Sequence, residues 1–173
     1  LLYSLASAEY IPTKSRVPEP RREFRAAWIS TVHNIDWPSK TTLTPSQQRA
    51  ELVGLLDTAA DTGLNAVILQ VRTECDAFYK SDIEPWSFFL TGSMGKAPSD
   101  GYDPLEFAVN EAHKRGIELH AWFNPFRASA TERSNKSPRH ISKTHPSLML
   151  PAGSMKWGNP ASETIRKLSL IHI

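Results

Sequence analysis

The sequence predicts an α/β fold that forms part of a (β/α)8 TIM barrel, with roughly the first three strand–helix units and a truncated third helix. Three strand–loop–helix units follow one another without a hairpin signal, which favours parallel strands. The long polar connections all follow strands, whereas those after helices, at Gly63 and Gly116, are minimal. In such a barrel the loops after the strands build the functional face, so this asymmetry favours the barrel.

An open, doubly wound sheet would also alternate strands and helices. Its dinucleotide-binding form carries a glycine-rich turn after the first strand. Residues 30–34 occupy that position here and contain no glycine. The barrel is therefore favoured over a dinucleotide-binding sheet.

The first strand is expected at residues 24–31, and a polar loop leads from it to the first helix. Thr44 can cap that helix, Pro45 suits its first position, and Gln47 completes a capping box. Gly63 is placed to end it. The apolar stripe expected to face the core consists of Leu52, Leu55, Leu56 and Ala59.

The second strand is expected at residues 64–72 and is followed by a long loop. The second helix begins with the same capping pattern as the first, with Asp103 as the cap, Pro104 next and Glu106 three residues after the cap. Gly116 is placed to end this helix. The spacing therefore predicts a second complete strand–helix unit.

The third strand is expected at residues 117–123. A single long loop then leads to Asn159 and Pro160, which again have the pattern of a cap followed by proline at the first helical position. The third helix is expected to begin there.

The composition is that of one globular domain: 173 residues, 40% hydrophobic and 22% charged. A net charge of +2 with scattered basic residues gives no support for nucleic-acid binding. The one cysteine, Cys75, has no partner for an internal disulfide, and no apolar run reaches the length of a transmembrane helix.

Both ends of the chain are unusual. Residues 1–8 contain a short apolar run followed by Ala6-Ser7-Ala8, the pattern of a signal-peptidase site, so we expect a signal-peptide remnant and an exported protein. A frayed apolar terminus is the alternative. Residues 9–22 are a lead-in, and residues 23–167 are expected to form the barrel portion. Residues 168–173 resemble a translated sequencing adapter and are expected to be an artefact, with a genuine helical turn as the alternative.

Two strands become polar on the same face toward their carboxyl ends. Because side chains alternate along a strand, Val67, Leu69 and Val71 should pack on helices, as should Ile117, Leu119, Ala121 and Phe123. The inward side chains are then Ile68, Gln70, Arg72, Glu118, His120, Trp122 and Asn124. Buried polar groups without partners cost about 1–3 kcal/mol each, so these groups should pair with one another or with a ligand.

Structural explanations remain open for several of these residues. Arg72 could form a buried salt bridge with Glu74, Asp76 or Glu118, and His120 could be a satisfied core histidine. Each tryptophan could be ordinary packing. Tryptophans that follow the strands also suit a carbohydrate, because indoles stack on the apolar faces of sugar rings; they are Trp37, Trp86 and Trp157.

Other chemistries have little support in the sequence. No pair of histidines has a metal-ligand spacing such as HExxH, and no serine lies in a GxSxG turn. The sequence therefore gives no indication of a metal, a cofactor or a serine nucleophile.

Five ordered motifs together resemble the bacterial glycosyl-hydrolase-like family ten over about residues 21–166. They are residues 24–38, 65–72, 84–87, 101–105 and 120–125. The resemblance implies a TIM-barrel catalytic domain, export, and glycosidase activity on cell-wall glycan, particularly peptidoglycan strands stripped of their peptides. The chain departs from the family at Thr73 and Cys75, where proline and glycine are expected.

Glycoside hydrolysis normally needs two carboxyl groups. The resemblance places a principal one after a fourth strand that this chain does not contain, so we expect this chain to bind sugar without cleaving it. Arg72, His120 and Asn124 are expected to form the sugar-binding floor. The supporting residues are expected to be Gln70, Asp76, Trp122, Arg127, Asn159, Trp37 and Trp86.

Two other functions stay open. One is an α-glucan hydrolase of the amylase type, which shares the barrel. The other is a non-catalytic carbohydrate-binding protein, which the sequence of a complete gene would test by the presence or absence of carboxylates at later strand ends.

Overall fold

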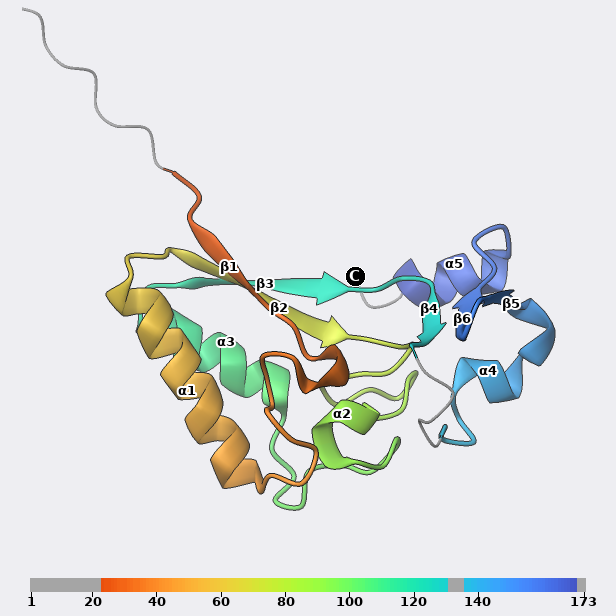
Figure 1. Cartoon of the computed structure of the whole chain (residues 1–173), viewed down its shortest axis with the longest axis horizontal. Helices are drawn as coiled ribbons and strands as arrows, with labels where there is room; N and C mark the ends of the chain where they lie inside the picture. Colours follow the sequence, from red (N-terminus) through yellow and green to blue (C-terminus); the bar gives the residue numbers. More distant parts are fainter. Residues whose placement is uncertain (1–22, 131–135, 171–173) are drawn as a thin grey trace, which may run out of the picture.

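The computed structural model describes residues 23–130 and 136–170. Its centre is a three-stranded parallel sheet in the order β1-β2-β3, formed by β1 (Ala26–Ile29), β2 (Ala66–Arg72) and β3 (Glu118–Phe123). Helices α1 (Pro45–Asp61) and α3 (Pro104–Lys114) cover one face of this sheet (Figure 1). The predicted α/β class and the parallel strands are confirmed.

The helix boundaries follow the predicted caps. The Thr44 side chain accepts a hydrogen bond from the Gln47 backbone and the reciprocal bond is present, so the capping box is complete. Asp103 accepts from the backbone N–H groups of Leu105 and Glu106. Gly63 follows α1 with a φ of 76°, a left-handed conformation that glycine adopts without strain. These local interactions fix the directions in which α1 and α3 leave the loops.

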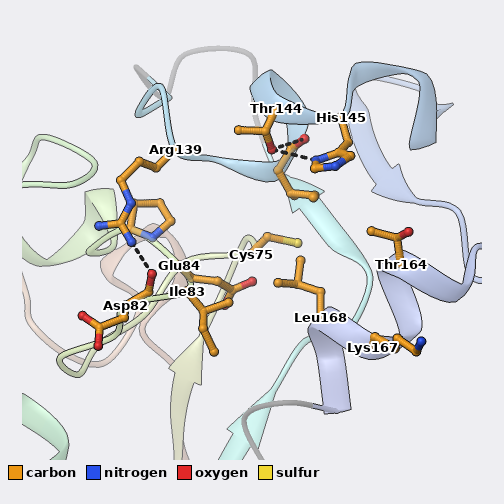
Figure 2. A pocket seen from close by; sticks show the side chains of 12 residues that line it. Cys75, Asp82, Ile83, Glu84, Arg139, Thr144, His145, Thr164, Lys167 and Leu168 are labelled. Atoms are coloured by element: carbon orange, nitrogen blue, oxygen red, sulfur yellow. Dashed lines mark hydrogen bonds between the residues drawn. The ribbon is translucent and has the colours of Figure 1, made fainter.

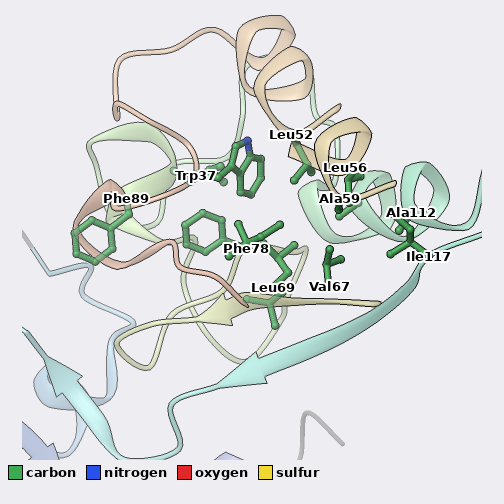
Figure 3. Close-up of a cluster of buried hydrophobic side chains, with 14 of the residues drawn as sticks. Trp37, Leu52, Leu56, Ala59, Val67, Leu69, Phe78, Phe89, Ala112 and Ile117 are labelled. Atoms are coloured by element: carbon green, nitrogen blue, oxygen red, sulfur yellow. The ribbon is translucent and has the colours of Figure 1, made fainter. Parts of the chain in front are cut away.

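The main core lies between the sheet and the two helices (Figure 3). Val67, Leu69 and Val71 face the helices and are buried, as the period-two alternation predicts. The helices contribute the side chains expected from their apolar stripes: Leu52, Leu56 and Ala59 from α1, and Ala108 and Ala112 from α3. No helix from the described residues covers the opposite face of the sheet (Figure 1).

The segment after β3 is not the single loop that we predicted. It contains a second, antiparallel sheet in the order β4-β6-β5, made of β4 (Arg127–Ser129), β5 (Met149–Ala152) and β6 (Met155–Gly158). Strands β5 and β6 form a hairpin whose two turn residues are Gly153 and Ser154. Gly153 has a φ of 62°, as required at the first central position of a type II′ turn. The expectation that no hairpin is present was therefore wrong.

Short helices complete the connections. In the loops after β1 and β2 lie η1 (Val32–Asn34) and α2 (Phe88–Thr91), while α4 (Ile141–Thr144) and η2 (Pro146–Leu148) precede β5. The small sheet, α4 and α5 (Glu163–Leu170) gather beyond the carboxyl end of β3 (Figure 1). A smaller core, centred on Cys75, Ala128, Ile141 and Ile165, joins these elements to the turn after β2.

Helix α5 begins later than the sequence predicts. The Asn159 side chain accepts a hydrogen bond from the Ala161 backbone at 2.9 Å and so holds a turn, and the helix starts at Glu163. Residues 1–22 and 171–173, which include the predicted signal remnant, the lead-in and half of the predicted artefact, lie outside the described residues. Among the described ranges, no helix is both long enough and apolar enough to cross a membrane.

Candidate functional site

The carboxyl end of β2 is built around a buried ion pair. The Arg72 guanidinium donates from Nε to Glu84 Oε2 at 2.7 Å and from Nη2 to Glu84 Oε1, and its Nη1 donates to the backbone oxygen of Asn124 at 2.6 Å. Burial alone would lower the pKa of Arg72. The hydrogen bonds and the negative charge of Glu84 have the larger combined effect with the neighbouring acidic groups, so the pKa of Arg72 is raised. The salt-bridge partner of Arg72 is thus Glu84, and the predicted candidates Glu74, Asp76 and Glu118 were wrong.

The turn that follows β2 is fixed by Asp76. Its carboxylate is fully buried and accepts from the backbone N–H groups of Thr73 at 2.9 Å and Glu74 at 2.7 Å, and from the Thr73 hydroxyl. The Asp76 carboxylate therefore accepts the hydrogen bonds that hold the backbone of the turn. Direct contact between this carboxylate and a sugar, which we expected, is not possible in this arrangement.

Cys75 lies at the apex of the same turn with a φ of 53°. Glycine adopts this left-handed conformation most easily, which explains why the family resemblance led us to expect glycine here. The thiol is buried and contacts the backbone oxygen of Arg127 at 3.5 Å. Burial raises the pKa of Cys75 to about 12. The residue is therefore a neutral packing group, which excludes a thiolate nucleophile at neutral pH.

Glu74 ties the turn to the segment that begins at residue 136. Its carboxylate binds the Lys136 ammonium at 2.5 Å and the backbone N–H of Ala130, and its backbone oxygen lies 2.6 Å from His140 Nε2. Burial lowers the pKa of His140, so the imidazole is neutral and donates from Nε2 while Nδ1 accepts from the Ser142 backbone. This network holds α4 against the carboxyl end of β2.

Polar groups at the end of β3 meet at one backbone atom. The oxygen of Thr73 accepts from Asn124 Nδ2 at 3.3 Å and from Arg127 Nε at 3.1 Å. The Asn124 side-chain oxygen accepts in turn from the Trp122 indole at 3.0 Å. Arg127 Nη2 is buried and has no hydrogen-bond partner within the described part of the chain. Trp122, Asn124 and Arg127 thus lie together, as the sequence predicts, and the Nη2 group of Arg127 remains unused.

Aromatic side chains line the face of the sheet that carries no helix. The Trp28 and Trp122 rings meet edge to face, with centroids 4.9 Å apart, and 61% of Trp28 is exposed. Phe24 and His120 form a second edge-to-face pair at 5.2 Å. We did not single out Trp28 from the sequence, although the alternation that points Trp122 inward would have indicated it, because Trp28 pairs in register with Ile68 of β2.

Gln70 and His120 lie on this face but play different parts. Gln70 is fully buried, and its side-chain oxygen accepts from the backbone N–H groups of Thr31 at 3.0 Å and Val32 at 2.9 Å. It therefore positions the loop after β1. His120 is exposed, with Nε2 3.2 Å from a Glu118 carboxylate oxygen, so it is not a satisfied core histidine.

A cavity of about 480 Å³ lies beside the Arg72–Glu84 pair. Figure 2 shows Cys75 and Leu168 near its centre, with Arg139 and Lys167 on opposite sides. Arg139 donates to the backbone oxygen of Asp82, and Lys167 binds Glu163 at 2.7 Å. The lining thus combines an apolar centre with charged side chains, of which Arg139, Lys167 and Glu84 already have partners. No group of three or more acidic, histidine or cysteine side chains among residues 23–130 and 136–170 could hold a metal ion.

Comparison with known proteins identifies the family. The family model described as "Glycosyl hydrolase-like 10" matches residues 23–168. The chain belongs to this family. The resemblance that the sequence motifs indicated is confirmed, and the family implies a TIM-barrel-like α/β fold, with which the parallel sheet and its helices agree.

Two curated relatives show how much of a glycosyl hydrolase-like 10 protein the chain represents. Glycosyl hydrolase YngK of Bacillus subtilis (strain 168) is 46% identical over 141 residues, which are 80% of this chain and 27% of YngK. Glycosyl hydrolase DigH of Escherichia coli (strain K12) is 37% identical over 133 residues, or 70% of this chain and 30% of DigH. The chain therefore spans less than a third of the length of these relatives.

Within this glycosyl hydrolase-like 10 chain, three predicted site residues come from loops outside the carboxyl ends of β2 and β3. Trp37 is 0% exposed, and its indole donates to the backbone oxygen of Gln48 at 2.8 Å, so neither ring face is open to a sugar. Trp86 lines a different cavity from Cys75 and Glu84. Asn159 uses its side-chain oxygen in the turn before α5. The sugar-stacking role of Trp37 was wrong; a sugar-binding role for Asn159 stays a prediction.

The predicted position of Arg72 in the sugar-binding floor also needs correction. Its guanidinium is 0% exposed and is bound by Glu84 and by the backbone oxygen of Asn124, so it supports the framework beneath the site and does not present N–H groups to a ligand. The predicted residues near the end of β3 that are exposed or partly exposed are His120, Trp122, Asn124 and Arg127, with Trp28 added by the structure. Their role in sugar binding remains a prediction.

Proposed function

We propose that this chain is part of a glycoside hydrolase that acts on bacterial cell-wall glycan, specifically peptidoglycan strands from which the peptides have been removed. The described residues supply part of the wall that binds the sugar. The family membership supports glycosidase chemistry, and the substrate follows from the resemblance of the sequence motifs to enzymes that act on such strands.

The observation that carries the proposal is the pair formed by Trp28 and Trp122. Their perpendicular rings, 4.9 Å apart, present indole surface on the face of the sheet that no helix covers. Aromatic rings bury large apolar areas with little loss of side-chain freedom, and sugar rings have apolar C–H faces that stack on them. The two indoles form a corner, the Trp28–Trp122 corner, near the carboxyl ends of β1 and β3. Because a barrel of this kind builds its functional face at the carboxyl ends of its strands, this corner suits a saccharide.

Polar groups beside the indoles suit the hydroxyl groups of the same ligand. Arg127 has an unused Nη2 donor, and burial lowers the pKa of this guanidinium without neutralising it. A buried donor without a partner costs about 1–3 kcal/mol, which a hydroxyl or carbonyl oxygen of a bound sugar would recover. Asn124, held at both ends by Trp122 and Thr73, orients this corner.

The proposal assigns binding, and not bond cleavage, to the described residues. The carboxylates near the strand ends are already engaged: Glu84 by Arg72, Glu74 by Lys136, and Asp76 and Asp36 by backbone N–H groups. A glycosidase needs one carboxyl group as an acid and another as a nucleophile or base. We therefore assign the catalytic pair to parts of the whole protein outside the described residues.

A closed barrel and export are further parts of the proposal. Three parallel strands with helices on one face match the beginning of a (β/α)8 barrel, in which the uncovered face would be the interior. Export is supported by the mostly apolar residues 1–5 and the Ala6-Ser7-Ala8 pattern, and it would place the enzyme where cell-wall glycan lies.

The activity is tested with the whole protein that contains this sequence. Purified protein is incubated with amidase-treated peptidoglycan, intact peptidoglycan and amylose, and new reducing ends are measured. We expect reducing ends from the amidase-treated strands alone. Release from amylose would favour an α-glucan hydrolase, and tight binding without release from any substrate would favour a non-catalytic carbohydrate-binding protein; either result contradicts the proposal.

A further inference from the structure

A second cavity opens on the other side of the loop that carries Glu84. Glu84 and Pro85 line the cavity of Figure 2, whereas the next residue, Trp86, lines a separate cavity of about 600 Å³ between this loop and the first turns of α3. Pockets that hold small ligands have volumes of about 300–1,000 Å³, so this one has room for a ligand larger than a water cluster.

Three aromatic rings form the apolar part of this cavity: Trp86, Tyr102 and Phe107. Tyr102 is held on three sides, because its hydroxyl donates to Gln48 Oε1 at 2.6 Å, the Arg49 guanidinium lies 4.7 Å from its ring centroid, and Phe107 meets it edge to face at 6.2 Å. A ring fixed in this way loses little freedom when a ligand packs against it.

Unused polar groups lie beside these rings. Glu106 and Asn110 are four residues apart on α3 and share one helix face, and Lys80, on the loop after β2, lines the same cavity. Among the described residues, the side chains of Glu106, Asn110 and Lys80 have no hydrogen-bond or ion-pair partner. Asp103 differs, because its carboxylate is occupied by the α3 cap and by the Lys80 backbone.

We propose that the cavity formed by Lys80, Trp86, Tyr102, Glu106, Phe107 and Asn110 is a second sugar-binding site. Its ligand is a short glycan that carries acetamido groups. Aromatic faces pack on the sugar ring, while the Asn110 carboxamide and the Glu106 carboxylate bind its acetamido and hydroxyl groups. The proposal rests on the proposed function for the identity of the ligand, but it concerns a different surface from the Trp28–Trp122 corner.

The site would hold a glycan strand at a distance from the cleaved bond. Two weak sites on one protein raise the overall affinity for a polymer that reaches both, because the second contact is made within the complex. Such an arrangement suits an insoluble, extended substrate. Short oligosaccharides would occupy the second site independently of the first.

The test uses the 173-residue chain and the tetramer of N-acetylglucosamine as the probe, with maltotetraose as the comparison sugar. Two-dimensional 1H–15N NMR follows the indole N–H of Trp86 and the side-chain amide of Asn110. We expect both signals to shift with the acetamido tetramer and not with maltotetraose.

Variants locate the effect. A Glu106→Ala/Asn110→Ala double variant should bind the tetramer at this site about tenfold more weakly, the loss expected for one or two hydrogen bonds. His113→Ala, which lies one turn beyond Asn110 on the same helix face but outside the lining of the cavity, is the matched control and should leave binding unchanged. No shift at Trp86, or equal binding by the double variant and the control, would overturn the second site. The second site would add affinity for the polymer without supplying the cleavage chemistry. The whole protein carrying the double substitution should therefore still release reducing ends from amidase-treated strands, and complete absence of release by the unaltered protein would contradict the proposed function separately.

Discussion

Arg72 and Glu84 form an ion pair in which only 0% and 3% of the two side chains are exposed. The pair joins the last residue of β2 to a loop residue twelve positions later, and Arg72 also reaches the backbone of Asn124 after β3. The residues expected to bind sugar therefore stand on a framework that depends on one buried charge pair. Removing either residue of this pair should destabilise the carboxyl end of the sheet.

Glu84→Ala should lower the free energy of unfolding by about 3–5 kcal/mol, because it leaves the Arg72 guanidinium buried and unpaired. Urea denaturation followed by circular dichroism measures this loss. An Arg72→Met/Glu84→Leu double variant should regain much of it, since no buried charge remains. Glu118→Ala, which removes an exposed carboxylate near His120, should change stability by less than about 0.5 kcal/mol. Equal, small losses for Glu84→Ala and Glu118→Ala would contradict the role of the pair.

Cys75 should resist alkylation in the folded protein. Burial raises the pKa of its thiol to about 12 from an ordinary value of 9.0, so the reactive thiolate is scarce at pH 8 and the sulfur is also shielded. The reaction with iodoacetamide, followed by mass spectrometry, should be at least about a hundredfold slower than in urea-unfolded protein. Rapid alkylation of the native protein at pH 8 would show that the turn after β2 is open.

His140 should make the stability fall in mild acid. Burial lowers the pKa of His140 in the folded state below its ordinary 6.5, and the nearby Lys136 ammonium acts in the same direction. The unfolded chain therefore binds more protons below pH 6.5, so the stabilisation by the neutral imidazole is present above that pH and is lost as the pH falls toward the folded pKa.

The free energy of unfolding, measured in urea between about pH 7.5 and 5.5, should decline more steeply for the natural chain than for His140→Gln. Glutamine can donate and accept as the neutral imidazole does but does not titrate. His113→Gln, on an exposed helix face, is the matched control and should keep the slope of the natural chain. Identical slopes for all three proteins would show that His140 is not the titrating group.

Two glycines should respond to alanine in opposite directions. A Cβ on Gly158 would lie 2.9 Å from Ile165 Cγ2, so Gly158→Ala should overpack the smaller core and lower the free energy of unfolding by about 1–3 kcal/mol. Gly54 lies inside α1 with open space around it, and Gly54→Ala should raise stability by about 0.5–1 kcal/mol. Thermal unfolding of both variants decides the matter. Stabilisation by Gly158→Ala would mean that α5 does not pack on β6 as described.

The sequence predicted those features that depend on neighbouring residues. The caps at Thr44 and Asp103 and the alternation around Leu69 each depend on residues that are close together in the sequence. The structure has each of these features where expected. The parallel direction of the strands could also be predicted, because a short connection from each helix to the next strand allows few other topologies.

The features that the sequence did not predict depend on long-range packing. Glu84 was overlooked as the partner of Arg72 because the chain between them folds back on itself. The predicted candidates were instead the carboxylates just after Arg72 in the sequence and an inward carboxylate of the third strand. Trp37 follows a strand, as a sugar-stacking residue would, yet the Gln48 carbonyl and the core hold it inside. The β5–β6 hairpin had a usable signal, since Gly153-Ser154 separates two short strands that contain apolar residues.

The central claim is that the Trp28–Trp122 corner binds peptide-free glycan, and equilibrium binding tests it most directly. Soluble strands from amidase-treated peptidoglycan are titrated into the 173-residue chain and into its Trp28→Ala and Trp122→Ala variants. His113→Ala serves as the control, because His113 is exposed on α3, which covers the opposite face of the sheet. We predict that each corner variant binds at least about tenfold more weakly, a loss of 1.4 kcal/mol, while His113→Ala binds normally. Equal affinities for all four proteins would contradict the claim.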